Sequence, residues 1–198
     1  MDYFNISNQQ KPTTGDVLIS NPMMGDPNFE RSIIYLCEHS NEGSLGLVLN
    51  KPSKVSLDEV IDDIESDEVP LFVGGPVEQN TLHYIYSVNT DSIIKKPLEG
   101  AKKISGDIYM GGDFDELKDI YLTLPFNTSH VKFFVGYSGW SEGQLQKEIE
   151  DNSWVVVKDP PASDIFNSSS RIHWKDMMTE LGGRYKMMSN YPVDPRLN

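Results

Sequence analysis

The stretch VKFFVGYSGWSEGQL, residues 131–145, says most about the fold of this chain. Four of its first five residues are apolar and predict a strand, and the glycines that follow predict a turn. The amphipathic segment from Gln144 to Asp151 then predicts a helix, with Ser141 and Gln144 as a capping box. A strand, a glycine-rich turn and a helix in this order can place backbone N–H groups and a hydroxyl around a small ligand. The stretch is therefore the first candidate for a functional site.

Further strands and helices are predicted on both sides of this corner. Hairpins mixed with strand–helix–strand units indicate an α/β fold (α+β-like), in which helices pack outside a mixed sheet. The expected strands cover residues 16–20, 32–39, 45–50, 71–74, 81–88, 103–110, 131–137 and 154–158. Four helices are expected. The first follows the capping box of Ser56 and Glu59, with Val60, Ile61 and Ile64 inward, and the second begins at Asp113. The third covers residues 142–151, and the fourth covers 171–181 and ends before Gly182-Gly183.

Size and composition favour one globular domain. The 198 residues are predicted to form an extended N-terminal arm (1–14) and a single domain (15–198). No apolar run approaches the roughly 20 residues of a membrane-spanning helix, and the polar N-terminus does not resemble a signal peptide. We therefore expect no membrane partner. With Cys37 as its one cysteine, the chain can form no internal disulfide, which predicts a cytoplasmic location.

The charge of the chain argues against direct binding of nucleic acid. Its net charge is −13, from 30 acidic and 17 basic residues. Affinity for DNA depends largely on neutralising phosphates, and the sequence has no basic stripe, zinc pattern or helix-turn-helix. A DNA-binding regulator therefore remains only as a disfavoured alternative.

Two groups of residues raise the alternative of an enzyme. Gly136-Tyr137-Ser138 begins like a nucleophile elbow, but Trp140 stands where the second glycine belongs. Cys37 and His39 share one face of a predicted strand, and a thiolate beside an imidazolium would be reactive. The apolar run before Cys37 equally fits a packed core thiol. The four histidines are scattered, so no metal site is predicted, and no motif predicts a cofactor.

The chain resembles the YqgE/AlgH family of bacterial proteins over nearly its whole length. The segments that carry this resemblance are Gly15–Ile19, Asn21–Met24, Asp26–Phe29, Cys37–His39, Gly46–Pro52, Gly74–Val77, Gly136–Trp140, Gly143–Leu145, Leu181–Gly183 and Pro192–Asn198. The resemblance implies a bifurcated mixed sheet curled into a pseudo-barrel with flanking helices, in a cytoplasmic protein. It implies no established biochemical activity, although some members are labelled regulators of alginate gene expression on genetic association. Ser138 departs from a frequent alanine, which argues against an essential hydroxyl there, and Lys51 stands where arginine is common.

These observations favour a non-enzymatic binding protein, or an indirect regulator, whose partner is a protein or a small molecule. Glycine, amide, carboxylate and tryptophan residues gather in loops that could converge, without an acid–base–nucleophile set. The predicted pocket consists of Asn21, Asp26, Cys37, His39, Asn50, Gly136, Ser138, Gly139, Trp140 and Gln144. The alternatives are an enzyme of unknown class that uses Cys37 or Ser138, and the DNA-binding regulator.

Overall fold

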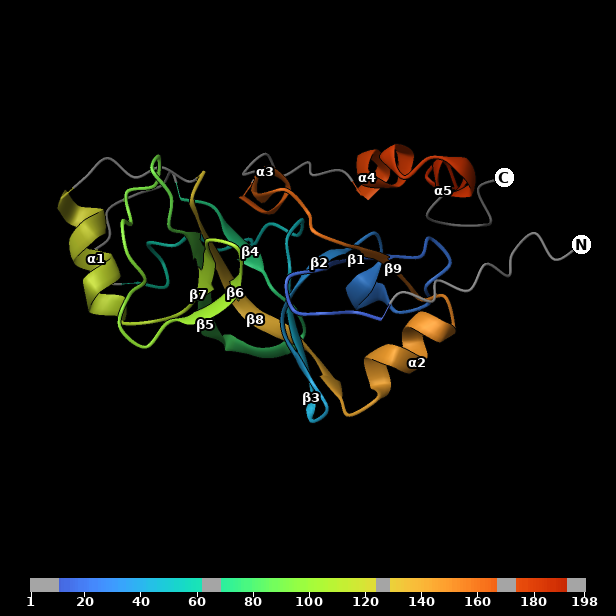
Figure 1. The fold of residues 1–198 in the computed structure, drawn as a ribbon, viewed down its shortest axis with the longest axis horizontal. Coiled ribbons are helices and arrows are strands. Elements are labelled where there is room, and N and C mark those ends of the chain that lie inside the picture. The colour runs from blue at the N-terminus through green and yellow to red at the C-terminus, as the bar shows by residue number, and fades with distance from the viewer. Residues whose placement is uncertain (1–10, 62–68, 124–128, 167–173, 192–198) are drawn as a thin grey trace, which may run out of the picture.

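A nine-stranded sheet with helices around it forms the body of the molecule (Figure 1). The computed structural model describes residues 11–61, 69–123, 129–166 and 174–191. The strands are β1 (Val17–Ser20), β2 (Ile33–Ser40), β3 (Gly43–Val48), β4 (Leu71–Val73), β5 (Val77–Ser87), β6 (Lys102–Ser105), β7 (Ile108–Met110), β8 (Val131–Ser141) and β9 (Trp154–Val157). Their order is β6-β7-β5-β8-β3-β2-β1-β9, and β4 pairs with β8 outside this path.

The sheet branches along β8, a strand of 11 residues. β5 runs antiparallel to β8 from Val77 opposite Tyr137 to Tyr86 opposite Val131. β4 pairs in parallel with residues 133–135, and β3 pairs antiparallel with residues 138–141. This arrangement confirms the predicted mixed, bifurcated sheet.

The sheet also curls, because its β6 edge returns to the strands at the other end. The hydroxyl of Ser105, at the end of β6, lies 2.9 Å from the hydroxyl of Tyr35 on β2. Lys102 forms a 2.7 Å ion pair with Glu38, again between β6 and β2. Ile104 joins the same buried cluster as Tyr35. These contacts agree with the pseudo-barrel that the family resemblance implies.

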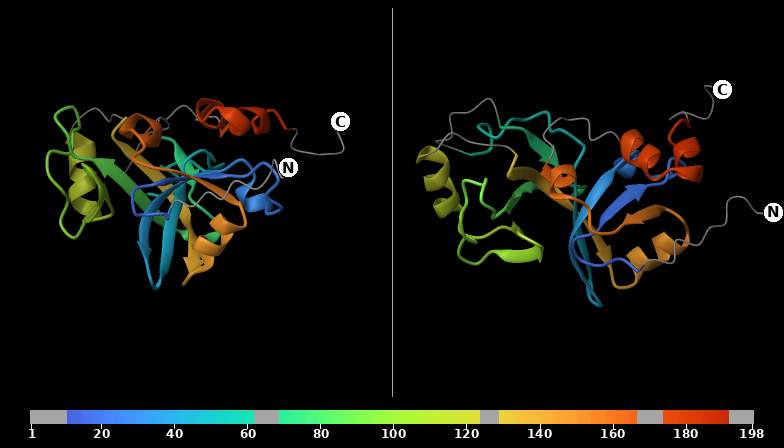
Figure 2. Two further views of the ribbon diagram at one scale, coloured as in Figure 1. Left: turned by 45° about the vertical axis from the view of Figure 1, so that its right-hand side comes forward. Right: turned by 45° about the horizontal axis from the view of Figure 1, so that its top comes forward.

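Alternation along the strands sends side chains into separate cores on the two faces of the sheet. Five α-helices cover these faces among the described residues: α1 (Phe114–Thr123), α2 (Gln144–Glu150), α3 (Ala162–Phe166), α4 (Trp174–Glu180) and α5 (Gly183–Met188). Ile33 and Tyr35 of β2 pack with α3 and α4, whereas Ile34 and Leu36 pack with α2. Figure 2 shows α2 and the α4–α5 pair on opposite sides of β1, β2 and β9. None of the helices described is long and apolar enough to cross a membrane.

Two strand predictions near glycines were wrong. The expected strand 131–137 is β8, but β8 continues through the expected glycine turn and ends at Ser141. Gly136 has φ +66°, and a Cβ there would lie 2.7 Å from the Val77 carbonyl oxygen, so the strand passes here only with glycine. The expected single strand 103–110 is a hairpin, β6 and β7, that turns at Gly106 with φ +48°.

The helix predictions held in part. α1 begins as expected, with the Asp113 carboxylate accepting from the Glu116 amide at 3.0 Å. The Gln144 side chain accepts from the Ser141 amide at 3.0 Å, which is half of the expected capping box. After Ser56 the described residues form only a turn, and Ile64 lies outside them. The sequence reading missed α3, and it missed α5, which starts directly after the predicted stop at Gly182.

Candidate functional site

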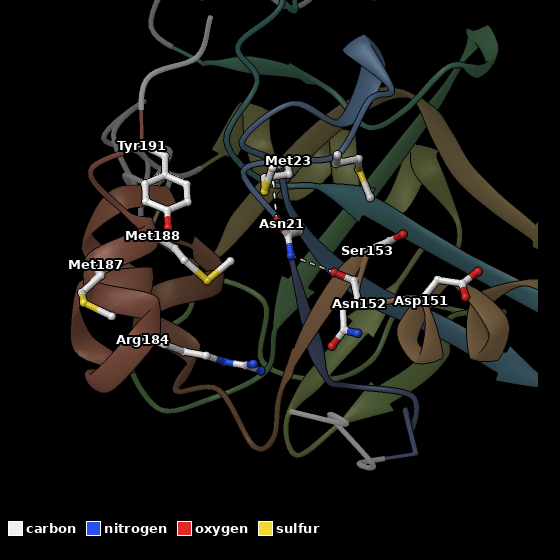
Figure 3. A pocket seen from close by; sticks show the side chains of 10 residues that line it. Asn21, Met23, Asp151, Asn152, Ser153, Arg184, Met187, Met188 and Tyr191 are labelled. Atoms are coloured by element: carbon white, nitrogen blue, oxygen red, sulfur yellow. Dashed lines mark hydrogen bonds between the residues drawn. The ribbon is translucent and has the colours of Figure 1, made fainter. Parts of the chain in front are cut away.

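A methionine-rich hollow lies between the Asn21–Met24 loop, the α2–β9 loop and helix α5 (Figure 3). Its volume is about 460 Å³. We call it the methionine pocket, and its lining residues are Asn21, Met23, Met24, Asp151, Asn152, Ser153, Arg184, Met187, Met188 and Tyr191. Its walls are mostly apolar, and amide, carboxylate and guanidinium groups interrupt them.

Hydrogen bonds hold the loop side of this pocket in place. The Asn21 amide nitrogen donates to the Asn152 carbonyl at 2.9 Å, and the Asn21 side-chain oxygen accepts from the Met23 backbone at 3.0 Å. The Asn21 backbone N–H donates to the Ser153 carbonyl at 2.9 Å. Asn21 therefore ties the loop after β1 to the loop before β9.

Helix α5 and Tyr191 close the opposite side. The Arg31 guanidinium donates to the Tyr191 carbonyl at 2.6 Å and lies over the Trp174 ring at 5.3 Å, which anchors the end of the described chain. Arg184 contacts the hydroxyl of Tyr185 at 3.0 Å. Figure 3 shows Arg184 reaching from α5 toward the side that Asn21 and Asn152 form.

Met24 connects the methionine pocket to a pair of tryptophans. Met24 packs against the buried cluster that contains Trp140 and Trp154. Both indole N–H groups donate to the same Glu148 carboxylate oxygen, at 2.9 Å and 2.8 Å. Phe29 lies against both rings, at 6.4 Å and 5.5 Å between centroids. Occupancy of the pocket is therefore expected to alter the environment of the tryptophans.

A second hollow, the polar bowl, brings together three of the predicted pocket residues. Its volume is about 740 Å³, and it is lined by Thr14, Cys37, Glu38, His39, Ser40, Glu42, Gly43, Ser44, Leu45, Lys102, Lys103, Tyr137 and Trp140. β2, β3 and β8 are neighbours, which is why Cys37, His39 and Trp140 meet here. His39 Nδ1 lies 2.7 Å from the Ser44 hydroxyl.

Cys37 and Ser138 do not have the surroundings of nucleophiles. Burial raises the pKa of the Cys37 thiol far above its ordinary range, so the thiol stays protonated at neutral pH. The Ser138 side chain is fully buried and donates to the Gly74 carbonyl at 3.0 Å, which fastens β8 to the end of β4.

A third hollow, the Lys51 cleft, contains the predicted residue Asn50. Its volume is about 410 Å³, and its lining residues are Pro27, Asn28, Val48, Asn50, Lys51, Pro52, Val73, Gly75, Pro76 and Gln79. Asn50 bridges two backbone groups, accepting from the Ile33 N–H at 2.9 Å and donating to the Arg31 carbonyl at 2.8 Å.

The remaining predicted residues line none of these three hollows. Asp26 accepts from the Asn28 amide at 2.8 Å and caps the short 3₁₀ turn Pro27–Phe29. Gly136 and Gly139 lie within β8, and Gln144 begins α2, where it donates to Glu148 at 2.9 Å. The residues predicted for one pocket are thus distributed over three hollows and the structure between them.

Comparison with known proteins identifies the family. The model of the AlgH-like family matches residues 17–186, which is most of the chain. The chain belongs to the AlgH-like family.

Relatives and solved structures of the AlgH-like family agree along nearly the whole chain. A UPF0301 protein of Cytophaga hutchinsonii is 40% identical over 186 residues, which are 94% of this chain and 99% of that protein. A UPF0301 protein of Bacteroides thetaiotaomicron is 36% identical over 199 residues, covering 100% of this chain and 97% of that protein. The crystal structure of DIP2367 from Corynebacterium diphtheriae superposes with a TM-score of 0.75 at 24% identity, covering 92% of this chain and 94% of that one. The solution structure of AlgH from Pseudomonas aeruginosa superposes with a TM-score of 0.67 at 27% identity, covering 93% of this chain and 97% of that one.

The sequence reading of this AlgH-like chain missed most of the methionine pocket. Only Asn21 of its lining was predicted as a site residue. The available signal was two methionine pairs, Met23-Met24 and Met187-Met188, because adjacent methionines in polar surroundings are typical of adaptable binding surfaces. Among the residues that the structure describes, no group of three potential ligands could hold a metal ion.

Proposed function

We propose that this protein is a non-enzymatic, cytoplasmic binding protein that takes a small amphipathic molecule into the methionine pocket. The apolar body of the ligand lies among the methionines, and its anionic head faces Arg184. Any effect on gene expression follows indirectly, through a protein partner that responds to the occupied state.

The observation that carries this proposal is an apolar hollow of ligand size with a few polar groups at its margin. Its volume of about 460 Å³ lies within the range of small-molecule sites. Met23 is 74% exposed and Met187 67% exposed, an arrangement that leaves large apolar surface in water when the pocket is empty. Methionine adapts its shape to varied apolar ligands because it is unbranched and polarisable.

The head group is assigned from the cation at the margin. Arg184 is the guanidinium among the lining residues, and guanidinium groups form paired hydrogen bonds with carboxylates. The amides of Asn21 and Asn152 lie on the facing side (Figure 3). Asp151 lines the same pocket and disfavours a ligand with more than one negative charge.

The surroundings of Cys37 and Ser138 favour binding over catalysis. The thiol is protonated and buried, and the hydroxyl is held by a backbone carbonyl. A nucleophile needs a base within hydrogen-bond reach, and neither side chain has one in its described contacts.

Octanoate and octanol form the pair of probes that tests this proposal. They share an apolar chain and differ in charge, so their difference isolates the head-group contact. We expect octanoate to bind saturably, raising the melting temperature and shifting tryptophan emission, and to bind about tenfold more tightly than octanol. Arg184→Gln should abolish this preference, and Lys186→Gln on the exposed side of the same helix should keep it.

The apolar contact is tested separately. Met187→Ser should weaken the binding of both probes several-fold, because it removes an apolar side chain from the pocket lining and leaves the buried core unchanged. Val55→Ser, at another exposed apolar side chain, serves as the control. Failure of both probes to bind saturably would overturn the proposal, as would binding that Arg184→Gln and Met187→Ser leave unchanged.

A further inference from the structure

Lys51 places an ammonium group in a cleft where no acidic side chain of the described residues pairs with it. The residue follows β3, and the cleft forms where this strand end meets the Pro27-Asn28 turn and the Gly75-Pro76 loop. The hollow of about 410 Å³ lies apart from the methionine pocket and shares none of its lining residues.

Lys51 makes one side-chain hydrogen bond within the part of the chain that the structure describes. Its Nζ donates to the backbone carbonyl of Asn28. An ammonium has three donors. No carboxylate in the described part of the chain lies within the 4.0 Å ion-pair distance of this nitrogen.

Lys158 provides a comparison for Lys51. Lys158 is also partly enclosed, and its Nζ pairs with the buried Asp16 carboxylate at 2.7 Å. Among the described acidic residues, Glu30 and Asp26 act on Lys51, and both do so from beyond ion-pair distance. Burial lowers the pKa of the Lys51 ammonium, and these two carboxylates partly oppose that effect. A ligand anion would offset the cost of this desolvation.

The walls beside the ammonium suit a short carbon skeleton. Val48 and Val73 contribute apolar surface, and Pro27, Pro52 and Pro76 add rigid rings. Asn50 is fixed by two backbone hydrogen bonds, so the strand end that carries Lys51 is held in place. Gln79 offers an amide at the margin.

We propose that the Lys51 cleft binds a small monocarboxylate. Its carboxylate accepts from Lys51 Nζ, and its short apolar body lies against Val48, Val73 and the prolines. A single negative charge is specified because Asp26 and Glu30 lie nearby and would repel a dianion such as phosphate. This site is independent of the ligand proposed for the methionine pocket.

Butyrate and inorganic phosphate are the probes, followed by NMR of protein with ¹³C-labelled lysine. The Cε signal of Lys51, assigned with Lys51→Arg, reports both binding and the charge state of the amine. We expect butyrate to shift this signal saturably and to raise the pKa of Lys51, because anion binding favours the ammonium form. Phosphate should bind about tenfold more weakly at matched ionic strength.

Variants separate a binding role from a structural one. Butyrate stabilisation measured by thermal shift should disappear in Lys51→Gln, persist in Lys51→Arg, and be unchanged in Lys54→Gln, an exposed lysine of the same loop. Arg184→Gln should leave the butyrate titration unchanged, which distinguishes this cleft from the methionine pocket. A Lys51 signal that butyrate does not move would overturn the proposal, and so would undiminished butyrate binding in Lys51→Gln.

Discussion

The Cys37 thiol is 3% exposed beneath the polar bowl, and its sulfur lies 3.5 Å from the Tyr35 carbonyl. We expect a thiol reagent such as an aromatic disulfide to leave the folded protein almost unlabelled at pH 7.5 and to label it stoichiometrically in denaturant. The physical reason is that burial both raises the thiol pKa and excludes the reagent. The absorbance of the released thiolate measures this, and rapid labelling of folded protein would contradict it.

Lys132 is the second residue whose chemistry burial controls. Its Nζ lies 4.1 Å from the Phe72 ring centroid and 3.5 Å from the Ile165 carbonyl, and burial lowers its pKa to about 7. The unfolded chain holds this proton up to about pH 10. Between pH 7 and pH 10 the unfolded state therefore holds the Lys132 proton more than the folded state does, and the contribution of Lys132 to stability should rise with pH.

Lys132→Met removes this dependence. We expect the variant to be more stable than the native protein near pH 7, by about 1–4 kcal/mol, because a buried charge is replaced by a packed apolar chain. The difference should shrink toward pH 10. Urea unfolding at both pH values measures it, with Lys103→Met as an exposed control. Parallel stability profiles for the native protein and Lys132→Met would contradict the assignment.

Glu148 links helix α2 to the sheet, because its carboxylate accepts from the indoles of Trp140 on β8 and Trp154 on β9. We expect Glu148→Ala to lower the free energy of unfolding by about 2–4 kcal/mol, because two buried indole donors lose a charged acceptor. Tryptophan emission should shift to the red as the helix loosens. Glu150→Gln, two residues along α2 and exposed, should change stability by less than about 0.5 kcal/mol. Equal effects of the two substitutions would refute the proposed role of Glu148.

The elements also show what sequence patterns can and cannot specify. The strand starting at Val131 and the helix starting near Gln144 were predicted because hydrophobic period and capping are local signals. The continuation of this strand through residues 138–141 was not predicted, because it depends on pairing with residues 43–46, far away in sequence. The same limit applies to the site. The methionine pocket joins the Asn21 loop to α5, and nothing local to either segment indicates that they meet.

The whole molecule differs from its parts most clearly in electrostatics. Arg184 lines the methionine pocket and Lys51 lines its own cleft, while the chain as a whole has a net charge of −13. A small monoanion interacts mainly with the nearby cation, whereas a polyanion interacts with the electrostatic field of the entire surface. The molecule should therefore select single charges at its clefts and repel extended phosphate backbones.

An arbitrary DNA duplex tests this consequence directly. At about 50 mM salt even non-specific DNA-binding proteins bind strongly, because phosphate neutralisation releases counterions. We expect no change in the anisotropy of a fluorescent 30-base-pair duplex at protein concentrations up to about 100 μM, the upper part of the non-specific range. Unchanged octanoate and butyrate binding in the same buffer would show that the protein is folded and active. Salt-sensitive binding of the duplex would instead reveal a basic surface and would restore the direct DNA-binding alternative, since a field of this sign cannot otherwise hold a phosphate backbone.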